Sequence, residues 1–141
     1  MRELSPAEMD EVLEAHYKYE AEDDVEGVLS TLTDDVVHDV VGFPGGPLRG
    51  KEAARTFYAH LFGDIKGERT MPRVRLYGPN FLVDEVTWEG VAVGRPFGFE
   101  GRNRPFSHRL LHVLEFRDGL ISRENVWLDF AAVAQQLGAS R

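Results

Sequence analysis

The chain has 141 residues, of which 43% are hydrophobic and 28% are charged, so it is long enough to form one domain with its own core. Its formal net charge of −8 argues against binding to nucleic acid or to an anionic membrane, because both need a basic surface. Cysteine is absent, which excludes disulfides, thiolate zinc sites and cysteine nucleophiles. The first residues lack a hydrophobic signal core, so we expect a single cytoplasmic domain over residues 1–141.

The first half of the chain combines helices with one strand. Ser5, Pro6 and Glu8 are typical of a helix start, with Ser5 as the N-cap and Glu8 completing a capping box. The β-branched run "DDVVHDVVGF" favours a strand over a helix. The predicted elements are a helix over about 5–20, a short helix from about 24, a strand over 34–43, a Gly/Pro loop over 42–50 and a helix over about 51–62.

The second half is dominated by strands. Asp118 and Gly119 lie at the centre of a hairpin signal between two apolar runs. The predicted elements are strands over 73–78, 81–94, 106–116 and 120–130, followed by a helix over 130–138. Helices followed by a meander of strands indicate an α+β fold with an antiparallel sheet.

Two stretches resemble a known superfamily. They are "DDVEGVLSTLTDDVVHDVVG…LRGKEAARTFYAHLF" and "LLHVLEFRDGLISRENVWLDFAAVAQQLG". The first is similar to ketosteroid isomerase-like proteins, and the second resembles the ending of SnoaL-like polyketide cyclases. Limonene epoxide hydrolase, scytalone dehydratase and nuclear transport factor 2 share this fold, so the likeness specifies architecture better than function.

The resemblance implies a cone-shaped α+β barrel. In such a fold a strongly curved, mostly antiparallel sheet wraps around the N-terminal helices and encloses a pocket. It also implies a small apolar ligand or substrate, a homodimer and no cofactor.

Three histidines are candidate pocket residues. His108 and His112 share one face of a strand because side chains alternate, and His16 interrupts the apolar stripe of the first helix. The resemblance places His16 and His112 at the two hydrogen-bonding positions of the isomerase pocket. A neutral imidazole there can donate one hydrogen bond and accept another. The alternative interpretation is that each histidine is a core residue satisfied by its neighbours.

The sequence does not predict a metal site. Four residues along a strand span about 13 Å, which is too far for His108 and His112 to bind one ion at about 2 Å each. No third ligand clusters with them in the sequence.

Two aspartates are candidates for the catalytic base. The resemblance places either Asp39 or Val40 at the isomerase's aspartate position, depending on the register, and a slip of one residue reverses the face. Asp129 matches the spacing of the cyclase acid/base residue, but an aspartate before a helix is also an ordinary N-cap. Of Asp84 and Glu85, we expect one to face solvent and Glu85 to be the one facing in.

These residues predict an enzyme that moves a proton on a small, mostly apolar carbonyl compound, by isomerisation, aldol cyclisation or dehydration. The sequence departs from the isomerase, because its tyrosine and paired acid are missing. Asn125 stands where the cyclases tend to have an aromatic residue, and Val126 stands where the epoxide hydrolase is expected to have its second acid. The alternative is a non-catalytic ligand-binding or dimerising module. The expected pocket lining comprises Tyr17, Phe57, Trp88, His108, Leu110 and Leu114.

Overall fold

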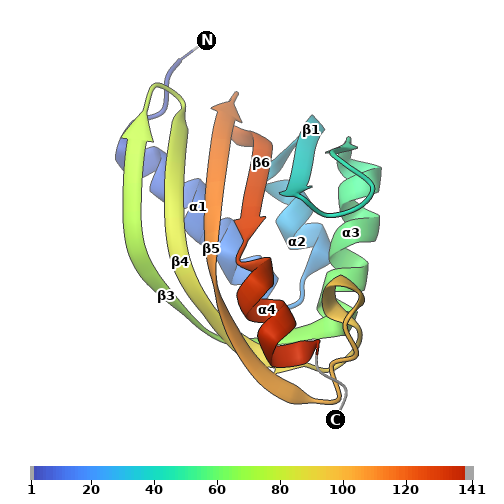
Figure 1. The fold of residues 1–141 in the computed structure, drawn as a ribbon. Helices are drawn as coiled ribbons and strands as arrows, with labels where there is room; N and C mark the ends of the chain where they lie inside the picture. The colour runs from blue at the N-terminus through green and yellow to red at the C-terminus, as the bar shows by residue number, and fades with distance from the viewer. Residues whose placement is uncertain (1, 139–141) are drawn as a thin grey trace.

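A computed structural model describes residues 2–138, which form four α-helices and one sheet (Figure 1). The helices are α1 (Pro6–Ala21), α2 (Val25–Ser30), α3 (Lys51–Asp64) and α4 (Phe130–Leu137), with a short 3-10 turn, η1, at Pro96–Gly98. The strands are β1 (Leu32–Val41), β2 (Leu48–Arg49), β3 (Ile65–Gly78), β4 (Phe81–Ala92), β5 (Arg104–Arg117) and β6 (Leu120–Leu128). No helix in this described part is long and apolar enough to cross a membrane.

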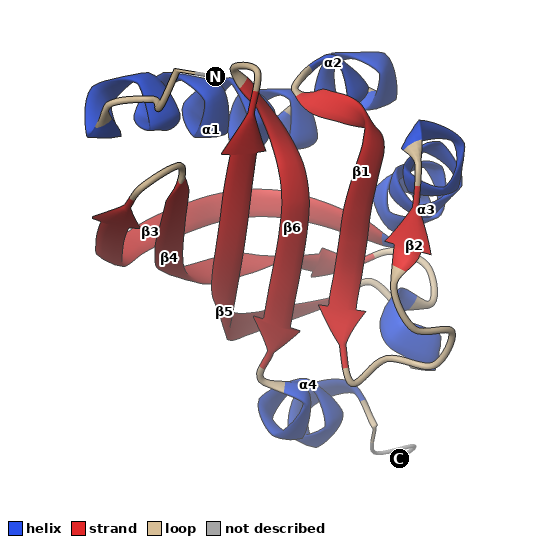
Figure 2. Ribbon diagram, turned by 90° about the horizontal axis from the view of Figure 1, so that it is seen from above, coloured by secondary structure: helices blue, strands red, loops and turns tan. Residues whose placement is uncertain are grey.

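The sheet has the strand order β2-β1-β6-β5-β4-β3. Every neighbouring pair is antiparallel except β1 and β6, which run parallel. The sheet curves strongly without closing, and it wraps around α1, α2 and α3 while α4 covers one end (Figures 1 and 2). The α+β fold, the mostly antiparallel curved sheet and the enclosed N-terminal helices are therefore confirmed.

Helix α1 begins as its sequence predicts. The side chain of Ser5 accepts a hydrogen bond from the Glu8 backbone N–H, and the Glu8 carboxylate accepts one from the Ser5 backbone N–H. This capping box satisfies two N–H groups that have no partner within the helix. Helix α1 then turns Met9, Leu13 and His16 toward the core.

Strand β5 buries one face along its whole length. Phe106, His108, His112, Leu114 and Phe116 are all buried, as alternation of side chains requires. The predicted inward direction of the even-numbered residues is confirmed.

Strand β3 is much longer than predicted. It begins at Ile65 rather than at 73 and pairs only with β4, which makes it an edge strand. Most of its residues are exposed on both faces, so the alternation that identifies a half-buried strand is missing. The predicted loop over 42–50 also contains the two-residue strand β2.

Candidate active site

A cavity of about 90 Å³ lies between the helices and the concave face of the sheet. Most of its wall is apolar, but five titratable side chains other than tyrosine also reach it. The lining residues are Glu20, His38, Val40, Phe57, Tyr58, Leu61, Ile65, Trp88, Phe97, His108, Leu110, His112, Glu124, Val126 and Leu128. A small apolar pocket with a few polar groups is the usual form of a small-molecule site.

Glu124 on β6 is the centre of a polar group that we call the acid–histidine cluster: His16, Glu20, His38, Tyr58 and Glu124. The Tyr58 hydroxyl donates a hydrogen bond of 2.8 Å to Glu124 Oε1. The same oxygen lies 3.4 Å from His16 Nε2 and 3.7 Å from His38 Nε2. Because Glu124 is almost fully buried, these neighbours replace the water that a carboxylate otherwise binds.

Thr31 fixes the orientation of the His16 ring. The Thr31 hydroxyl donates its proton to the Val28 carbonyl oxygen at 2.6 Å, so it can only accept from His16 Nδ1, which is 2.8 Å away. His16 Nδ1 therefore carries a proton, and Nε2 faces the carboxylates of Glu20 and Glu124.

The charges of the acid–histidine cluster shift its pKa values in opposite directions. Burial opposes the charged form of His16, but Glu124 and Glu20 outweigh it and raise the pKa of His16 to about 10. Burial also opposes ionisation of Glu124, yet His16 and the neighbouring histidines hold the pKa of Glu124 well below its usual range. Burial lowers the pKa of His38, so that this ring is neutral.

A second set of hydrogen bonds, the Arg75–His112 chain, reaches the cavity from the surface. Arg75 Nε donates to Asp84 Oδ1 at 2.8 Å, and the Tyr17 hydroxyl donates to Asp84 Oδ2 at 2.7 Å. Tyr17 has then used its only proton, so its oxygen can only accept from His112 Nδ1 at 3.2 Å. His112 is thus held as the Nδ1–H tautomer, with Nε2 free to accept a proton.

Tyr17 itself stays protonated throughout this chain. Burial and the adjacent Asp84 carboxylate raise the pKa of Tyr17 well above its ordinary value. Arg75, at the outer end of this chain, also donates hydrogen bonds to Asp10 and Glu14 on α1, and these hold its guanidinium in place.

His108 lies at the other end of the cavity among aromatic rings. It stacks on Phe106 with an interplanar angle of 7°, and Trp88 meets it edge to face. Burial lowers the pKa of His108 to about 4, and its Nδ1 has no hydrogen-bond partner among the described residues. This ring is therefore a neutral part of the wall.

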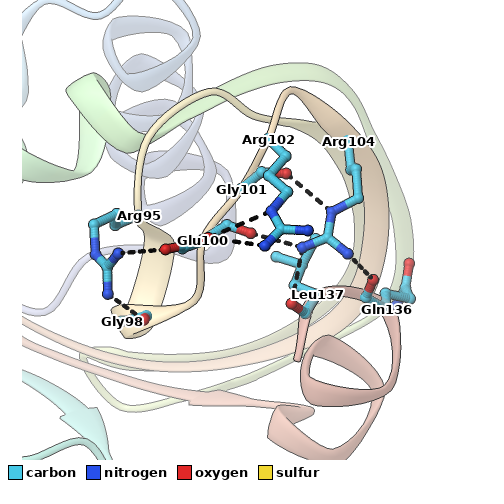
Figure 3. Close-up of polar contacts among 8 residues, drawn as sticks. All are labelled: Arg95, Gly98, Glu100, Gly101, Arg102, Arg104, Gln136 and Leu137. Atoms are coloured by element: carbon cyan, nitrogen blue, oxygen red, sulfur yellow. Dashed lines mark hydrogen bonds and ion pairs between the residues drawn. The ribbon is translucent and has the colours of Figure 1, made fainter. Parts of the chain in front are cut away.

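The segment between β4 and β5 closes this end of the cavity. Phe97, at a positive φ of 54°, contacts His108 and Phe130. Arg104 ties the segment to α4, because its guanidinium donates to the carbonyl oxygens of Gly101, Gln136 and Leu137 (Figure 3).

The structure brings most of the sequence-predicted residues together. Phe57, Trp88, His108, Leu110 and His112 line the cavity. Behind this wall, His16 contacts Glu124, and Tyr17 contacts His112. Leu114 packs in the hydrophobic core and does not line the cavity.

The two predicted aspartates lie elsewhere. Strand β1 turns His38 and Val40 into the cavity, so Asp39 points to the opposite face and the register with Val40 inside is the correct one. Asp129 accepts a hydrogen bond from the Ala132 backbone N–H as the N-cap of α4, and it does not line the cavity. Asp84 is buried and Glu85 is not, which reverses the prediction for this pair.

The sequence did not predict the centre of the acid–histidine cluster. Glu124, His38 and Tyr58 were not identified, because Glu124 directly follows Arg123 in β6 and His38 directly precedes Asp39 in β1, so no isolated charge marks either strand. His38 and Glu124 are direct partners in the parallel pairing of β1 and β6, and Asp84 and His112 are direct partners across β4 and β5.

A protein-family model, the SnoaL-like domain, matches residues 13–124. The chain belongs to the SnoaL-like family. The match covers α2, β1 and α3 and most of the sheet, and it includes every member of the acid–histidine cluster. No curated protein matches this SnoaL-like chain.

Solved structures share the SnoaL-like architecture at low sequence identity. TsrD from Streptomyces laurentii is 21% identical with a TM-score of 0.82, covering 97% of this chain and 99% of its own. A protein assigned to the SnoaL-like polyketide cyclases, from Jannaschia sp. CCS1, is 16% identical with a TM-score of 0.84 and full coverage of both chains. An LEH-like epoxide hydrolase of M. tuberculosis is 21% identical with a TM-score of 0.73, covering 93% of this chain and 90% of its own. Such identities establish the fold alone.

Proposed function

We propose that this SnoaL-like protein is an enzyme that moves a proton on a small, mostly apolar carbonyl compound. The observation that carries the proposal is the Arg75–His112 chain, which holds His112 at the cavity wall with Nε2 available as a base. Neighbours in the fold described as polyketide cyclase, isomerase and epoxide hydrolase support an enzyme of this kind.

His112 is the base in this reaction, in place of Asp39 and Asp129. Its Nε2 takes a proton from the carbon next to the substrate carbonyl, and the electron pair of that C–H bond passes to the carbonyl oxygen. The positive charge on the ring is then stabilised through Nδ1–H by Tyr17 and the buried Asp84. Return of the proton to another carbon completes an isomerisation. In a cyclisation the enolate carbon attacks a second carbonyl, whose oxygen takes the electron pair of the C=O bond and then the proton from His112 Nε2.

His38 is the donor to the developing oxygen charge. Its Nδ1 is buried without a partner among the described residues, which favours the tautomer with the proton on Nε2. The nearest carboxylate oxygen, on Glu124, is 3.7 Å from Nε2 and too far to take that proton in a hydrogen bond. The N–H is therefore available to a ligand in the cavity.

The experiment is proton exchange in D₂O, measured by NMR on a panel of small cyclic ketones. We expect the wild-type protein to exchange the hydrogens next to the carbonyl, and His112→Gln to lose this by about 100-fold or more. His60→Gln is the matched control, because His60 is an exposed histidine on α3. Equal exchange by wild type and His112→Gln would remove His112 from the mechanism.

Ligand binding without catalysis is a second candidate function. Its supporting observation is that His16, Tyr58 and Glu124 already contact one another. A binding protein would take up an apolar ketone, seen in NMR spectra as shifted signals of the cavity methyl groups. It would not exchange the hydrogens of the bound ketone.

We also propose a homodimer formed through the outer face of the sheet. Leu111 and Trp127 are direct partners on β5 and β6, and they are 37% and 39% exposed. Light scattering should give twice the chain mass, and Trp127→Glu should give the monomer mass. Leu76→Glu, on edge strand β3, is the control and should stay dimeric.

A further inference from the structure

Three side chains of the acid–histidine cluster converge on one point beside the cavity. His16 and Glu20 are one turn apart on α1, and Glu124 reaches them from β6. One donor atom from each lies within 4.8 Å of the others. His16 Nε2 is 2.9 Å from Glu20 Oε1 and 3.4 Å from Glu124 Oε1.

We propose that His16, Glu20 and Glu124 bind a divalent first-row transition-metal ion through one imidazole nitrogen and two carboxylate oxygens. Ligands that each lie about 2.0–2.2 Å from such an ion are separated from one another by about 3.0–3.5 Å. Both distances from His16 Nε2 fall near this range. The site is separate from His108 and His112, which are too far apart along β5 to share an ion.

The direction of the contact between His16 and Glu20 fits an ion held between them. Glu20 Oε1 is buried and has no hydrogen-bond partner among the described residues, although it lies 2.9 Å from His16 Nε2. At that distance only a wrong angle prevents a hydrogen bond, so the oxygen lies off the axis of an N–H bond at Nε2. Two ligands of one ion are arranged in this way, because the ion takes the place of the Nε2 proton and the carboxylate oxygen lies beside it. The Tyr58 hydroxyl, 3.4 Å from Nε2, borders the same point.

The groups around these three residues also suit a metal site. His16 donates its Nδ1–H to Thr31, which leaves Nε2 directed at the carboxylates, and Tyr58 donates to Glu124 Oε1. Metal-binding histidines and carboxylates are commonly oriented by such hydrogen bonds. Glu20 and Glu124 both line the cavity, and the Glu20 side chain is 27% exposed, so an ion can reach this ligand from solvent.

Mixed imidazole and carboxylate ligands favour zinc, cobalt or manganese over calcium or magnesium. The experiment therefore titrates the full chain with Zn²⁺ and Co²⁺, by calorimetry and by the visible spectrum of bound Co²⁺. We expect one ion per chain, and loss of the Co²⁺ spectrum in Glu20→Gln. Glu20 is partly exposed, so this variant is the one least able to disturb folding.

Two further variants sharpen the test. Thr31→Val removes the acceptor of the His16 Nδ1–H group and should weaken binding by about 10–100-fold. His60→Ala removes an exposed histidine and should bind as wild type does. Absence of Zn²⁺ binding by the wild-type chain, equal binding by Glu20→Gln, or loss of binding in His60→Ala would each overturn the proposal. Because the readout is binding, the result does not depend on the proposed reaction.

Discussion

Tyr17 donates its only hydroxyl proton to Asp84 across 2.7 Å, and Asp84 is buried, with 1% of its surface exposed. The tyrosine thereby becomes an acceptor toward the cavity. Tyr17, which does not line the cavity, thus decides which nitrogen of His112 carries the proton.

Tyr17→Phe should release His112 from the Nδ1–H tautomer, because the ring loses the acceptor that selects it. Long-range ¹⁵N–¹H NMR of the His112 ring should show a mixture of tautomers in place of one. Loss of the bond to buried Asp84 should also lower the free energy of unfolding by about 1–3 kcal/mol. Tyr77→Phe is the control, since the Tyr77 hydroxyl bonds Asp10 at the surface. An unchanged His112 spectrum in Tyr17→Phe would contradict the assignment.

Glu124→Gln should be the most destabilising of the conservative changes in the site. It removes the buried one of the two carboxylates that balance His16, and leaves only the partly exposed Glu20 beside the charged ring. Breaking a buried pair in this way costs about 3–5 kcal/mol, which urea unfolding can measure. Glu115→Gln, on the exposed face of neighbouring β5, should change the free energy of unfolding by less than about 0.5 kcal/mol. A small effect at Glu124 would show that the pair is not a charged one.

His108 should make the fold lose stability in mild acid. Its pKa is about 4 in the folded protein against 6.5 for an ordinary histidine, so between these values the unfolded chain binds more protons. Stability from this group is complete above pH 6.5 and is lost as the pH falls toward 4. At about 1.4 kcal/mol per pKa unit the loss is of the order of 3 kcal/mol.

The variant His108→Phe tests this pH dependence. It keeps a ring against Phe106 and removes the titration. Urea unfolding at pH 7 and at a pH near 4.5 should show a smaller difference in His108→Phe than in wild type. Equal differences would mean that His108 is not a source of acid sensitivity.

Arg104→Gln should loosen helix α4 from the end of the cone. Its guanidinium binds the last carbonyl oxygens of α4 and the loop before β5, and hydrogen bonds from a charged group are worth about 1.5–3 kcal/mol. Amide hydrogen exchange should become faster in α4 while α1 keeps its protection. Arg102→Gln is the control, because within residues 2–138 the hydrogen bonds of the Arg102 guanidinium go to exposed Glu100. Unchanged exchange in α4 would show that its apolar face alone holds the helix.

The fold and part of the candidate site could be predicted from the sequence. The rest could not, because it depends on contacts between distant segments. The inward face of β5 follows from alternation within one strand, so His108 and His112 were placed correctly. The register of β1 against β6 depends on contacts between distant segments, and nothing local to "DDVVHDVVGF" specifies whether His38 or Asp39 faces inward. Glu124 could not be recognised as central without that pairing.

The parallel contact of β1 with β6 means that the site is assembled from the two ends of the fold. His38 and Glu124 become neighbours only when the last strand has docked against the first. A chain that ends before β6 retains His16 and Glu20 on α1 but lacks Glu124, which lies beside them in the folded protein. Any molecule that needs both His38 and Glu124 can therefore bind only after this pairing of distant segments has formed.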